Sequence, residues 1–364
     1  MLLLKFLTNR VKSIGSSFKK KDKKDPAKST VFLAVTELFM VALGILLALY
    51  IDRWNSTQNF EKQFESTLRI VQQNLESDIY NSDNVIAHFY ARDSLRHDVM
   101  LNKFDREYYE KGLTYWQQVI VFYNQYQVTI EGYNLLLDMK DEVPEKYSDI
   151  FKKVKKMYKM LPNLDEYNKN FKKIIWNIHD ELAYSHWFWL DSYYGKVSEE
   201  QIDFFINDPY YKALVQKVVN ASALLNNMAR THRIKAIDMY NEINDILGLI
   251  EEVPENITYI LNDSISKNYI GKYNLVEGEM GTWFPKYYVE NAVLEIGIKD
   301  SILYLMKDEK HATPLYYFKR IFKNRNYPIK KNHIFISGVG YFEFYKNGNL
   351  RIGAAGPETI WQKQ

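Results

Sequence analysis

The stretch Thr30–Asn55, TVFLAVTELFMVALGILLALYIDRWN, decides the organisation of this chain. Residues 31–51 of this stretch, 21 positions in all, contain one charged side chain, Glu37. The hydrocarbon core of a bilayer needs roughly 20 predominantly apolar residues in a helix. The stretch therefore predicts a transmembrane helix, and Tyr50 and Trp54 are expected to anchor its outer end at the membrane interface.

The residues before the span carry most of the positive charge of the chain. Residues 1–29 contain nine Lys or Arg and two Asp, a net charge of +7, whereas the remainder contains 39 basic and 43 acidic residues, a net charge of −4. The positive-inside rule then predicts that the N-terminus is cytoplasmic and that the bulk of the chain lies on the other side of the membrane. Five lysines close to the span are expected to contact lipid headgroups: Lys19, Lys20, Lys21, Lys23 and Lys24. The alternative, a tail that binds nucleic acid, is the less direct explanation, and we expect no nucleic-acid partner.

The leader also shows a helical pattern. Apolar residues recur at spacings of three and four through residues 2–20, which predicts an amphipathic helix on the inner leaflet or, alternatively, a helix packed on a partner. A cleaved signal peptide would have a shorter basic region and an apolar run of 7–15 residues followed by a small-residue cleavage site. The long leader and long apolar run favour an uncleaved signal anchor.

Three positions of the span share one helical stripe. Glu37, Gly44 and Ala48 are separated by seven and four residues, and Gly44-x-x-x-Ala48 is a small-xxx-small pattern that lets two helices approach closely. This stripe predicts a homo-oligomer. Two alternatives remain open: Glu37 reaches the headgroups without any partner, or it lines an ion path.

Residues 56–252 predict an extracytoplasmic domain of long α-helices. Its first helix leaves the membrane with apolar residues at spacings of three and four and is expected to run to about Leu101. The apolar residues of this face are Phe60, Phe64, Leu68, Val71, Leu75 and Ile79. Further helices are expected at about 107–139, 145–160, 164–194, 200–206 and 210–250, with Asp208 as an N-cap before Pro209.

The pattern changes near residue 253, and residues 253–364 predict a small antiparallel β-domain, either a sheet or a partial barrel. Short runs rich in Tyr, Phe, Val and Ile alternate there with Gly, Asn and Pro. Asn347-Gly348 lies between two such runs and predicts a hairpin with a type I′ turn. The fold class is therefore α+β: a transmembrane helix that continues into a mainly helical domain, followed by the β-domain.

The span and its exit resemble the N-terminal signature of a large family of uncharacterised bacterial single-pass membrane proteins. That signature is a helix with Glu, an apolar run, Gly-Ile-Leu-x-Ala-Leu and a closing Trp-Asn. The matching residues are Glu37, Gly44, Ile45, Leu46, Ala48, Leu49, Trp54 and Asn55. The resemblance covers roughly residues 30–110. It implies a single-pass protein of the bacterial inner membrane with the bulk of the chain in the periplasm, and it implies no activity because the activity of the family is unknown. The longer basic leader departs from the signature of the family.

A second resemblance concerns the β-domain. Gly271-Lys-Tyr273, followed by β-rich runs, is similar to the start of the small β-domain appended to some serine-hydrolase-like proteins. This resemblance covers about 90 residues and carries no catalytic residue to the chain.

The sequence contains no motif that predicts a catalytic, metal or cofactor site. It has no cysteine, which excludes disulfides, Cys-ligated zinc and thiol nucleophiles. Ser-x-x-Lys occurs at 16–19 and 264–267 without the other motifs of serine enzymes of that class. His179 and His186 are seven residues apart, about 10 Å along a helix, whereas helical zinc pairs are four apart.

The densest aromatic run is Tyr184–Tyr194. It predicts either part of a Tyr-rich core or a partner interface, and a ligand that stacks on rings, such as a glycan, is a third alternative. The candidate interface residues are Trp187, Trp189, Tyr193 and Tyr194.

Three functional hypotheses follow from the sequence. The first is a membrane-anchored envelope protein, a scaffold, sensor or partner-binding module without enzymatic chemistry, oligomeric and able to bind another envelope protein. The second is an envelope hydrolase or ligand-binding enzyme with a dispersed site, for which a deep polar cleft between the helical and β-domains would be the signature. The third is a pore or ion path that uses Glu37.

Overall fold

The structure is a computed structural model. It describes residues 26–111, 116–191, 194, 196–249, 254, 257, 261–278, 292–306, 312–318, 332–337, 340–353 and 358–364. The chain divides into two compact units, Met1–Gln63 and Phe64–Gln364, which are described separately below. The leader lysines Lys19, Lys20, Lys21, Lys23 and Lys24 lie outside the described residues.

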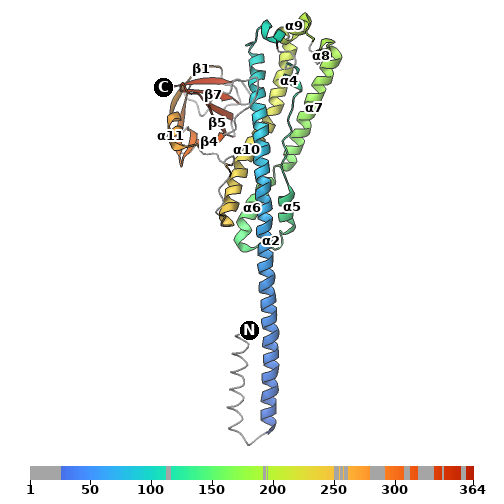
Figure 1. Cartoon of the computed structure of the whole chain (residues 1–364), viewed down its shortest axis with the longest axis vertical. Coiled ribbons are helices and arrows are strands. Elements are labelled where there is room, and N and C mark those ends of the chain that lie inside the picture. Colours follow the sequence, from blue (N-terminus) through green and yellow to red (C-terminus); the bar gives the residue numbers. More distant parts are fainter. Residues whose placement is uncertain are drawn as a thin grey trace. The chain divides into compact units, whose positions relative to one another are not determined.

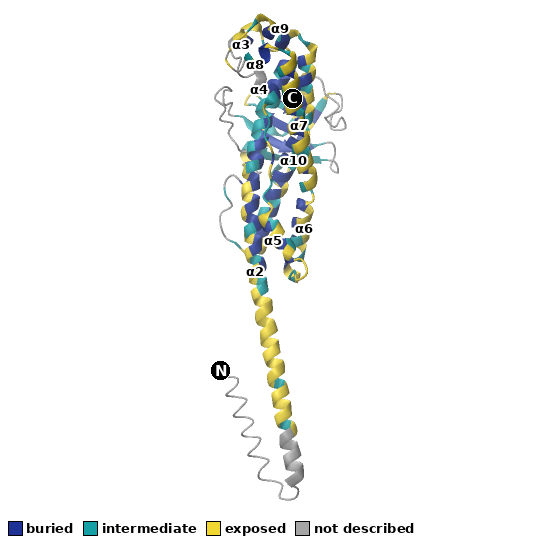
Figure 2. Cartoon of the chain, turned by 90° about the vertical axis from the view of Figure 1, so that its right-hand side faces the viewer, coloured by how far each residue is buried: buried dark blue, intermediate teal, exposed yellow. Residues whose placement is uncertain are grey.

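The described part of the first unit belongs to helix α2 (Pro26–Met100), which also supplies the first residues of the second unit (Figure 1). Within residues 35–63 the side chains are exposed or half-buried, and none is buried (Figure 2). The exposed apolar residues include Leu38, Phe39, Ile45, Leu46 and Leu49. This helix is long and apolar enough to cross a membrane. The predicted continuous helix to about Leu101 is confirmed.

The second unit contains the helical part of the chain. From Phe64 onward the face of α2 that the apolar spacing predicts is buried: Phe64, Leu68, Val71, Leu75 and Ile79 are fully covered. The elements after α2 are α3 (Arg106–Lys111), α4 (Trp116–Val121), α5 (Glu131–Asp138), η2 (Glu145–Tyr147), α6 (Ser148–Tyr158), α7 (Leu161–Ser185), α8 (Phe188–Asp191), α9 (Glu199–Asn207), α10 (Pro209–Ile246), α11 (Asp263–Ser266) and η5 (Lys267–Tyr269). The longest of them, α10, packs against α4, α6, α7 and α9 (Figure 1).

Two helix starts follow the capping rules. The Asp208 side chain accepts a hydrogen bond from the Tyr210 N–H at 2.7 Å, with Pro209 at the first helical position of α10. The Ser198 side chain accepts one from the Gln201 N–H at 3.1 Å at the start of α9. Each cap provides a partner for a backbone N–H that has none inside its helix. The predicted cap at Asp208 is confirmed.

The predicted single helix over 107–139 is wrong. The structure has α3, α4 and α5 in this range, and residues 122–130 form neither helix nor strand. Side chains from other elements bind the backbone of this segment and replace the hydrogen bonds of a helix.

Asn168 on α7 and Asp78 on α2 hold this segment. The Tyr126 N–H donates to Asn168 Oδ1 at 3.1 Å, and Asn168 Nδ2 donates to the Tyr126 carbonyl at 2.7 Å. The Thr129 N–H donates to Asp78 Oδ1 at 2.7 Å. Because these side chains lie more than 40 residues away in sequence, a local helical pattern could not reveal their effect.

The C-terminal strands close into an eight-stranded antiparallel barrel. The strands are β1 (Gly271–Glu277), β2 (Val293–Lys299), β3 (Ile302–Met306), β4 (Ala312–Phe318), β5 (His333–Ser337), β6 (Gly340–Phe344), β7 (Asn349–Gly353) and β8 (Thr359–Lys363). Each strand pairs with its neighbour in sequence, and β1 pairs with β8, so the expected sheet or partial barrel is a closed barrel. The coarser part of the predicted fold class is confirmed: the chain is mainly helical, with a long N-terminal helix and a C-terminal antiparallel β-part.

Alternate residues of the strands form the core of the barrel. An eight-stranded barrel is just wide enough for side chains to fill its interior. The buried residues of this cluster on the strands are Tyr273, Leu294, Ile296, Leu303, Leu305, Leu315, Phe335, Phe342, Phe344, Leu350, Ile352 and Trp361.

The predicted hairpin between β6 and β7 is confirmed, but its turn is of another type. Gly348 has a φ of 85°, whereas Asn347 does not have a positive φ. A type I′ turn needs positive φ at both central residues. The Gly348 N–H donates to the Tyr345 carbonyl at 3.1 Å, and the Tyr345 N–H donates to the Asn349 carbonyl at 2.9 Å. These bonds close a hairpin loop that is longer than a two-residue turn and has Gly348 in the left-handed region.

Candidate functional site

The outer face of β4–β6 is buried against helices. In these strands Phe318, Ile334, Ile336 and Tyr341 belong to the same apolar cluster as the core of the helical part. Strand β6 is buried on both faces because Phe342 and Phe344 point to the barrel core while Tyr341 packs on the helices. The helical part and the barrel therefore share one core, and their junction is a fixed part of the second unit.

Helix α10 contacts this junction through polar side chains one turn apart. Asn226 donates to the Tyr341 hydroxyl, and Arg230 Nε donates to the Ser337 carbonyl at 3.0 Å. The Arg230 guanidinium also lies over the Tyr341 ring, 5.0 Å from its centroid. These contacts satisfy polar groups that the apolar junction would otherwise leave unpaired.

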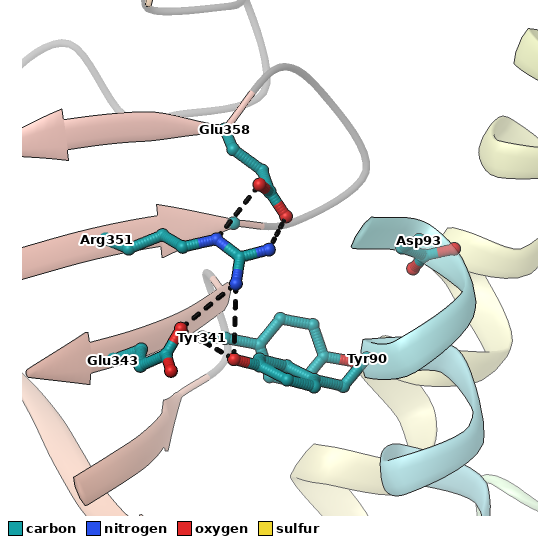
Figure 3. Close-up of a pocket in the computed structure, with 7 residues that line it drawn as sticks. Tyr90, Asp93, Tyr341, Glu343, Arg351 and Glu358 are labelled. Carbon is teal, nitrogen blue, oxygen red and sulfur yellow. Dashed lines mark hydrogen bonds and ion pairs between the residues drawn. The ribbon is translucent and has the colours of Figure 1, made fainter. Parts of the chain in front are cut away.

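A small polar crevice lies at the junction of α2 and the barrel (Figure 3). Its lining residues are Tyr90 and Asp93 of α2 and Tyr341, Glu343, Arg351, Gly353 and Glu358 of the barrel side. Tyr90 and Asp93 share a face of α2 because they are three residues apart. On the barrel, Glu343 and Arg351 are cross-strand partners in β6 and β7.

Arg351 holds the centre of this crevice. Its Nη1 lies 3.0 Å from Glu343 Oε2, its Nε lies 2.9 Å from Glu358 Oε2, and its Nη2 binds the other oxygen of Glu358 (Figure 3). The guanidinium also lies over the Tyr90 ring, 5.6 Å from its centroid. Burial acts to lower the pKa of Arg351, but Glu358 and Tyr90 outweigh it and raise that pKa well above its ordinary value. The side chain is therefore a permanent cation between two carboxylates.

Glu343 is the acceptor that links the barrel to α2. It accepts hydrogen bonds from the Tyr90 hydroxyl at 2.7 Å, from Asn332 Nδ2 at 2.7 Å and from the Tyr345 hydroxyl at 3.1 Å. Burial acts to raise the pKa of Glu343, but Arg351 and these hydrogen bonds leave it below its ordinary value. Glu343 is thus ionised at neutral pH.

Asp93 and His97 extend the polar face of α2. Asp93 pairs with Arg96 at 3.0 Å, and burial raises the pKa of Asp93 to about 6 although Arg96 acts to lower it. His97 Nε2 accepts a hydrogen bond from the Glu358 N–H at 3.0 Å, which requires a neutral imidazole. Burial lowers the pKa of His97, in agreement with that role.

The size of the crevice limits what it can bind. Its free volume of about 10 Å³ is close to the space that one water molecule needs. The crevice lies between the helical and β-parts, where the hydrolase hypothesis expects a deep polar cleft, but its free volume is far smaller than a substrate-sized cleft. Among the described residues, no group of three or more metal-binding side chains is placed to hold an ion.

The membrane stripe lies on the first unit. Glu37, Gly44 and Ala48 are all exposed on α2, and apart from its own helix backbone and its chain neighbours no atom lies within 4 Å of a Cβ placed on Gly44. The described part of the chain thus leaves this stripe open, and self-association through it stays a prediction.

The predicted aromatic interface is partly core. Trp189 is 0% exposed and packs on Phe205 in the helical core, so this residue follows the core alternative rather than the partner interface. By contrast, Trp187 is 62% and Tyr194 81% exposed. Tyr193 lies outside the described residues.

Further exposed residues accompany Trp187 and Tyr194 between the last turn of α7 and the start of α9. We call this set the aromatic surface; it consists of Tyr184, Trp187, Leu190, Tyr194 and Val197. Tyr184 is 91% exposed, and the Trp187 indole N–H donates to Glu200 Oε2 at 2.9 Å. Helix α8 contacts both α7 and α9, so the helices of this region lie close to one another (Figure 1).

The histidines and serine that the sequence analysis considered take part in local contacts. His179 lies 3.4 Å from Asp180, whereas the His186 ring packs on Phe188 and Phe204, so the two imidazoles have separate partners. The Ser264 hydroxyl donates to Asn262 Oδ1 at 2.6 Å at the start of α11.

Sequence reasoning missed the residues of the crevice. One signal was present: in Tyr341–Tyr345, Glu343 interrupts an aromatic run, and the Asn-Gly hairpin pairs it with Arg351. A charged pair in a strand that is otherwise apolar on both faces indicates a buried polar contact.

Comparison of the chain with protein-family models, curated proteins and solved structures found no match.

Proposed function

We propose that this protein is a membrane-anchored partner-binding module, and that the aromatic surface binds a protein. The observation that carries the proposal is the exposure of Tyr184, Trp187 and Tyr194 in a region whose other large rings, such as Trp189 and Phe205, are buried. Exposed apolar surface of this kind marks interaction sites, and Trp and Tyr dominate the binding energy of protein interfaces.

The apolar part of α2 supports the anchor. Most of its large apolar side chains between positions 35 and 54 are exposed, and water is an unfavourable environment for so much apolar area on one helix. A bilayer removes this cost, and the basic leader favours an orientation with the N-terminus in the cytoplasm and the second unit outside. In this proposal the span also joins two copies through Glu37, Gly44 and Ala48.

The crevice supports a structural role for the junction. Arg351, Glu343 and Glu358 are bound to one another and to Tyr90 and His97, so these polar groups already have partners within the protein. Such a network fixes the barrel on α2 and keeps the second unit in one arrangement.

Site-specific photocrosslinking in intact cells tests the proposal. Benzoylphenylalanine would replace Tyr184 or Tyr194 and, as the matched control, Tyr80, which is 58% exposed on α2 outside this surface. We expect a discrete adduct at positions 184 and 194 that is lost when Trp187→Ala is added, and none at position 80. Absence of the adduct, or equal adducts at all three positions, would contradict the proposal.

A further inference from the structure

We infer that the aromatic surface recognises a Lys- or Arg-rich segment of its protein partner. This inference rests on the proposed function, because it names the chemistry of the partner that the same surface binds. Three features carry it: the charge of the region, the partners of its carboxylates and the position of the exposed rings.

The region around the aromatic surface is strongly acidic. Residues 180–208 contain seven acidic residues and one lysine, Lys196, which gives a net charge of −6 with histidine neutral. The whole chain, in contrast, carries +3. The acidic residues are Asp180, Glu181, Asp191, Glu199, Glu200, Asp203 and Asp208. A surface of one sign attracts a partner of the opposite sign and rejects one of its own sign.

Several of these carboxylates have neutral partners. Glu200 accepts from the Trp187 indole, Glu181 from the Tyr210 hydroxyl and Asp203 from the Asn207 amide. Among the described residues, no cationic side chain pairs with Glu181, Glu200 or Asp203. In the described part of the chain their charge is therefore not neutralised by an ion pair, and it is available to a cationic ligand.

Other carboxylates of the region are already paired. Glu199 binds Arg106, and Asp191 lies 4.0 Å from Lys196, at the limit of an ion pair. The carboxylates without a cationic partner are thus Glu181 near the end of α7, and Glu200 and Asp203 on α9, of which Glu200 contacts Trp187.

The exposed rings select the type of cation. Trp187 and Glu200 are joined by a hydrogen bond, so a guanidinium or ammonium over the indole face lies close to a carboxylate. Cation–π contacts are strongest with Trp, and a guanidinium can stack on a ring and donate to a carboxylate at the same time. Tyr184 and Tyr194 offer two further rings within eleven residues of sequence.

A second copy of the chain is a poorer occupant of this surface. A symmetric dimer would place the same acidic residues opposite one another. Like charges that face each other in an interface oppose association. Self-association through this surface is therefore an outcome that would overturn the inference.

Binding of a defined basic peptide tests the inference. The full-length protein would be placed in nanodiscs of phosphatidylcholine, which has no net charge, and titrated against a short fluorescein-labelled peptide of alternating Gly and Arg. Fluorescence anisotropy would give Kd, and a peptide of alternating Gly and Glu serves as the probe of opposite charge. We expect binding of the Arg peptide only, weakened at least about tenfold between low salt and physiological salt.

Variants connect the binding to the named residues. We expect Trp187→Ala to raise Kd by about fivefold, and Glu181→Gln with Glu200→Gln to raise it by about tenfold or more. Tyr80→Ala and Asp165→Asn, which change exposed residues outside the region, are the matched controls and should leave Kd unchanged. Equal binding by all variants, binding of both peptides, no binding, or a homodimer crosslinked through position 194 would overturn the inference.

The two proposals fail in distinguishable ways. A crosslinked partner at position 184 that persists at high salt, together with no Arg-peptide binding, would leave the proposed function standing and overturn the basic partner. Absence of any crosslinked partner would overturn the proposed function, whatever the peptide result.

Discussion

Glu343 and Arg351 face each other on strands β6 and β7 and form an ion pair of 3.0 Å on the outer side of the barrel. The Tyr90 hydroxyl of α2 donates to the same Glu343 oxygen at 2.7 Å, and Glu358 binds the opposite edge of the guanidinium. One cross-strand pair thus connects the β-part to a helix 253 positions away in sequence. The junction is held by charge in its polar part and by apolar packing beside it.

Arg351→Met should loosen the barrel. Removal of the cation leaves Glu343 and Glu358 with little exposure and without a counter-charge among the residues that the structure describes. A broken buried pair costs about 3 kcal/mol or more. We expect amide hydrogen exchange in β7 and β8 to become about 100-fold faster, because a loss of about 3 kcal/mol in the free energy of local opening raises the population of the open state by that factor. Mass spectrometry of the exchanging protein in detergent measures this.

An exposed arginine provides the control for that experiment. Arg106 pairs with Glu110 and Glu199 while half-exposed, and such pairs contribute little because water screens them. Arg106→Met should leave exchange in the barrel unchanged. Equal protection of β7 and β8 in Arg351→Met and wild type would show that the ion pairs do not hold the junction.

Gly132→Ala should destabilise the second unit. A Cβ at this position would lie 2.7 Å from the Val71 backbone nitrogen and 2.9 Å from its Cα, where only the backbone of α2 could move. The Gly132 N–H also donates to Asn74 Oδ1 at 2.7 Å, so displacement weakens a buried hydrogen bond. Overpacking of this kind costs about 1–3 kcal/mol, and the melting temperature by circular dichroism should fall.

Gly44→Ala is the matched glycine replacement, since apart from its own helix backbone and its chain neighbours no atom lies within 4 Å of its Cβ. It should leave the melting temperature of the second unit unchanged. The close contact of α5 with α2 would be contradicted if both replacements had the same effect.

Local patterns predicted the elements whose partners lie nearby in the sequence. The spacing of Phe64, Leu68 and Val71 identified the buried face of α2, and Asn347-Gly348 identified the β6–β7 hairpin. Both depend on periodicity or on turn chemistry that a few neighbouring residues determine.

The features that depend on distant partners were not predicted. The segment 122–130 is not helical because Asp78 and Asn168 bind its backbone, and neither residue is near it in sequence. The closure of the barrel was not predicted because it depends on the pairing of β8 with β1, almost 90 residues earlier. The crevice was missed for the same reason, since it forms only when α2 meets the hairpin.

Gly44→Leu combined with Ala48→Leu should abolish self-association through the span. Two leucines would prevent the close approach that small residues allow, and packing is the main attraction between helices in a bilayer. We expect the protein in nanodiscs, analysed by native mass spectrometry, to change from an oligomer to a monomer. Leu46→Ala, exposed and outside the stripe, is the control; an unchanged oligomer in the double variant would contradict the contact.

Asp78 should make the second unit less stable as the pH rises. Its Oδ1 accepts from the Thr129 N–H, but its Oδ2 has no partner among the described residues. Burial raises the pKa of Asp78 from 3.8 to about 7, while the hydrogen bonds from Thr129 act to lower it. The folded protein therefore binds this proton more tightly than the unfolded chain, and stability is lost between pH 4 and pH 7 as the proton leaves.

Asp78→Asn isolates this effect because asparagine keeps the acceptor for Thr129 and cannot ionise. The free energy of unfolding of wild type, relative to this variant, should fall by on the order of 3 kcal/mol between pH 4 and pH 8. His88 and His232 have pKa values lowered to about 3 by burial and give the opposite slope between about pH 3 and pH 6.5 in both proteins. Their contribution cancels in the difference. Urea unfolding at each pH measures it, with the exposed Asp138→Asn as control, and parallel pH profiles for wild type and Asp78→Asn would contradict the prediction.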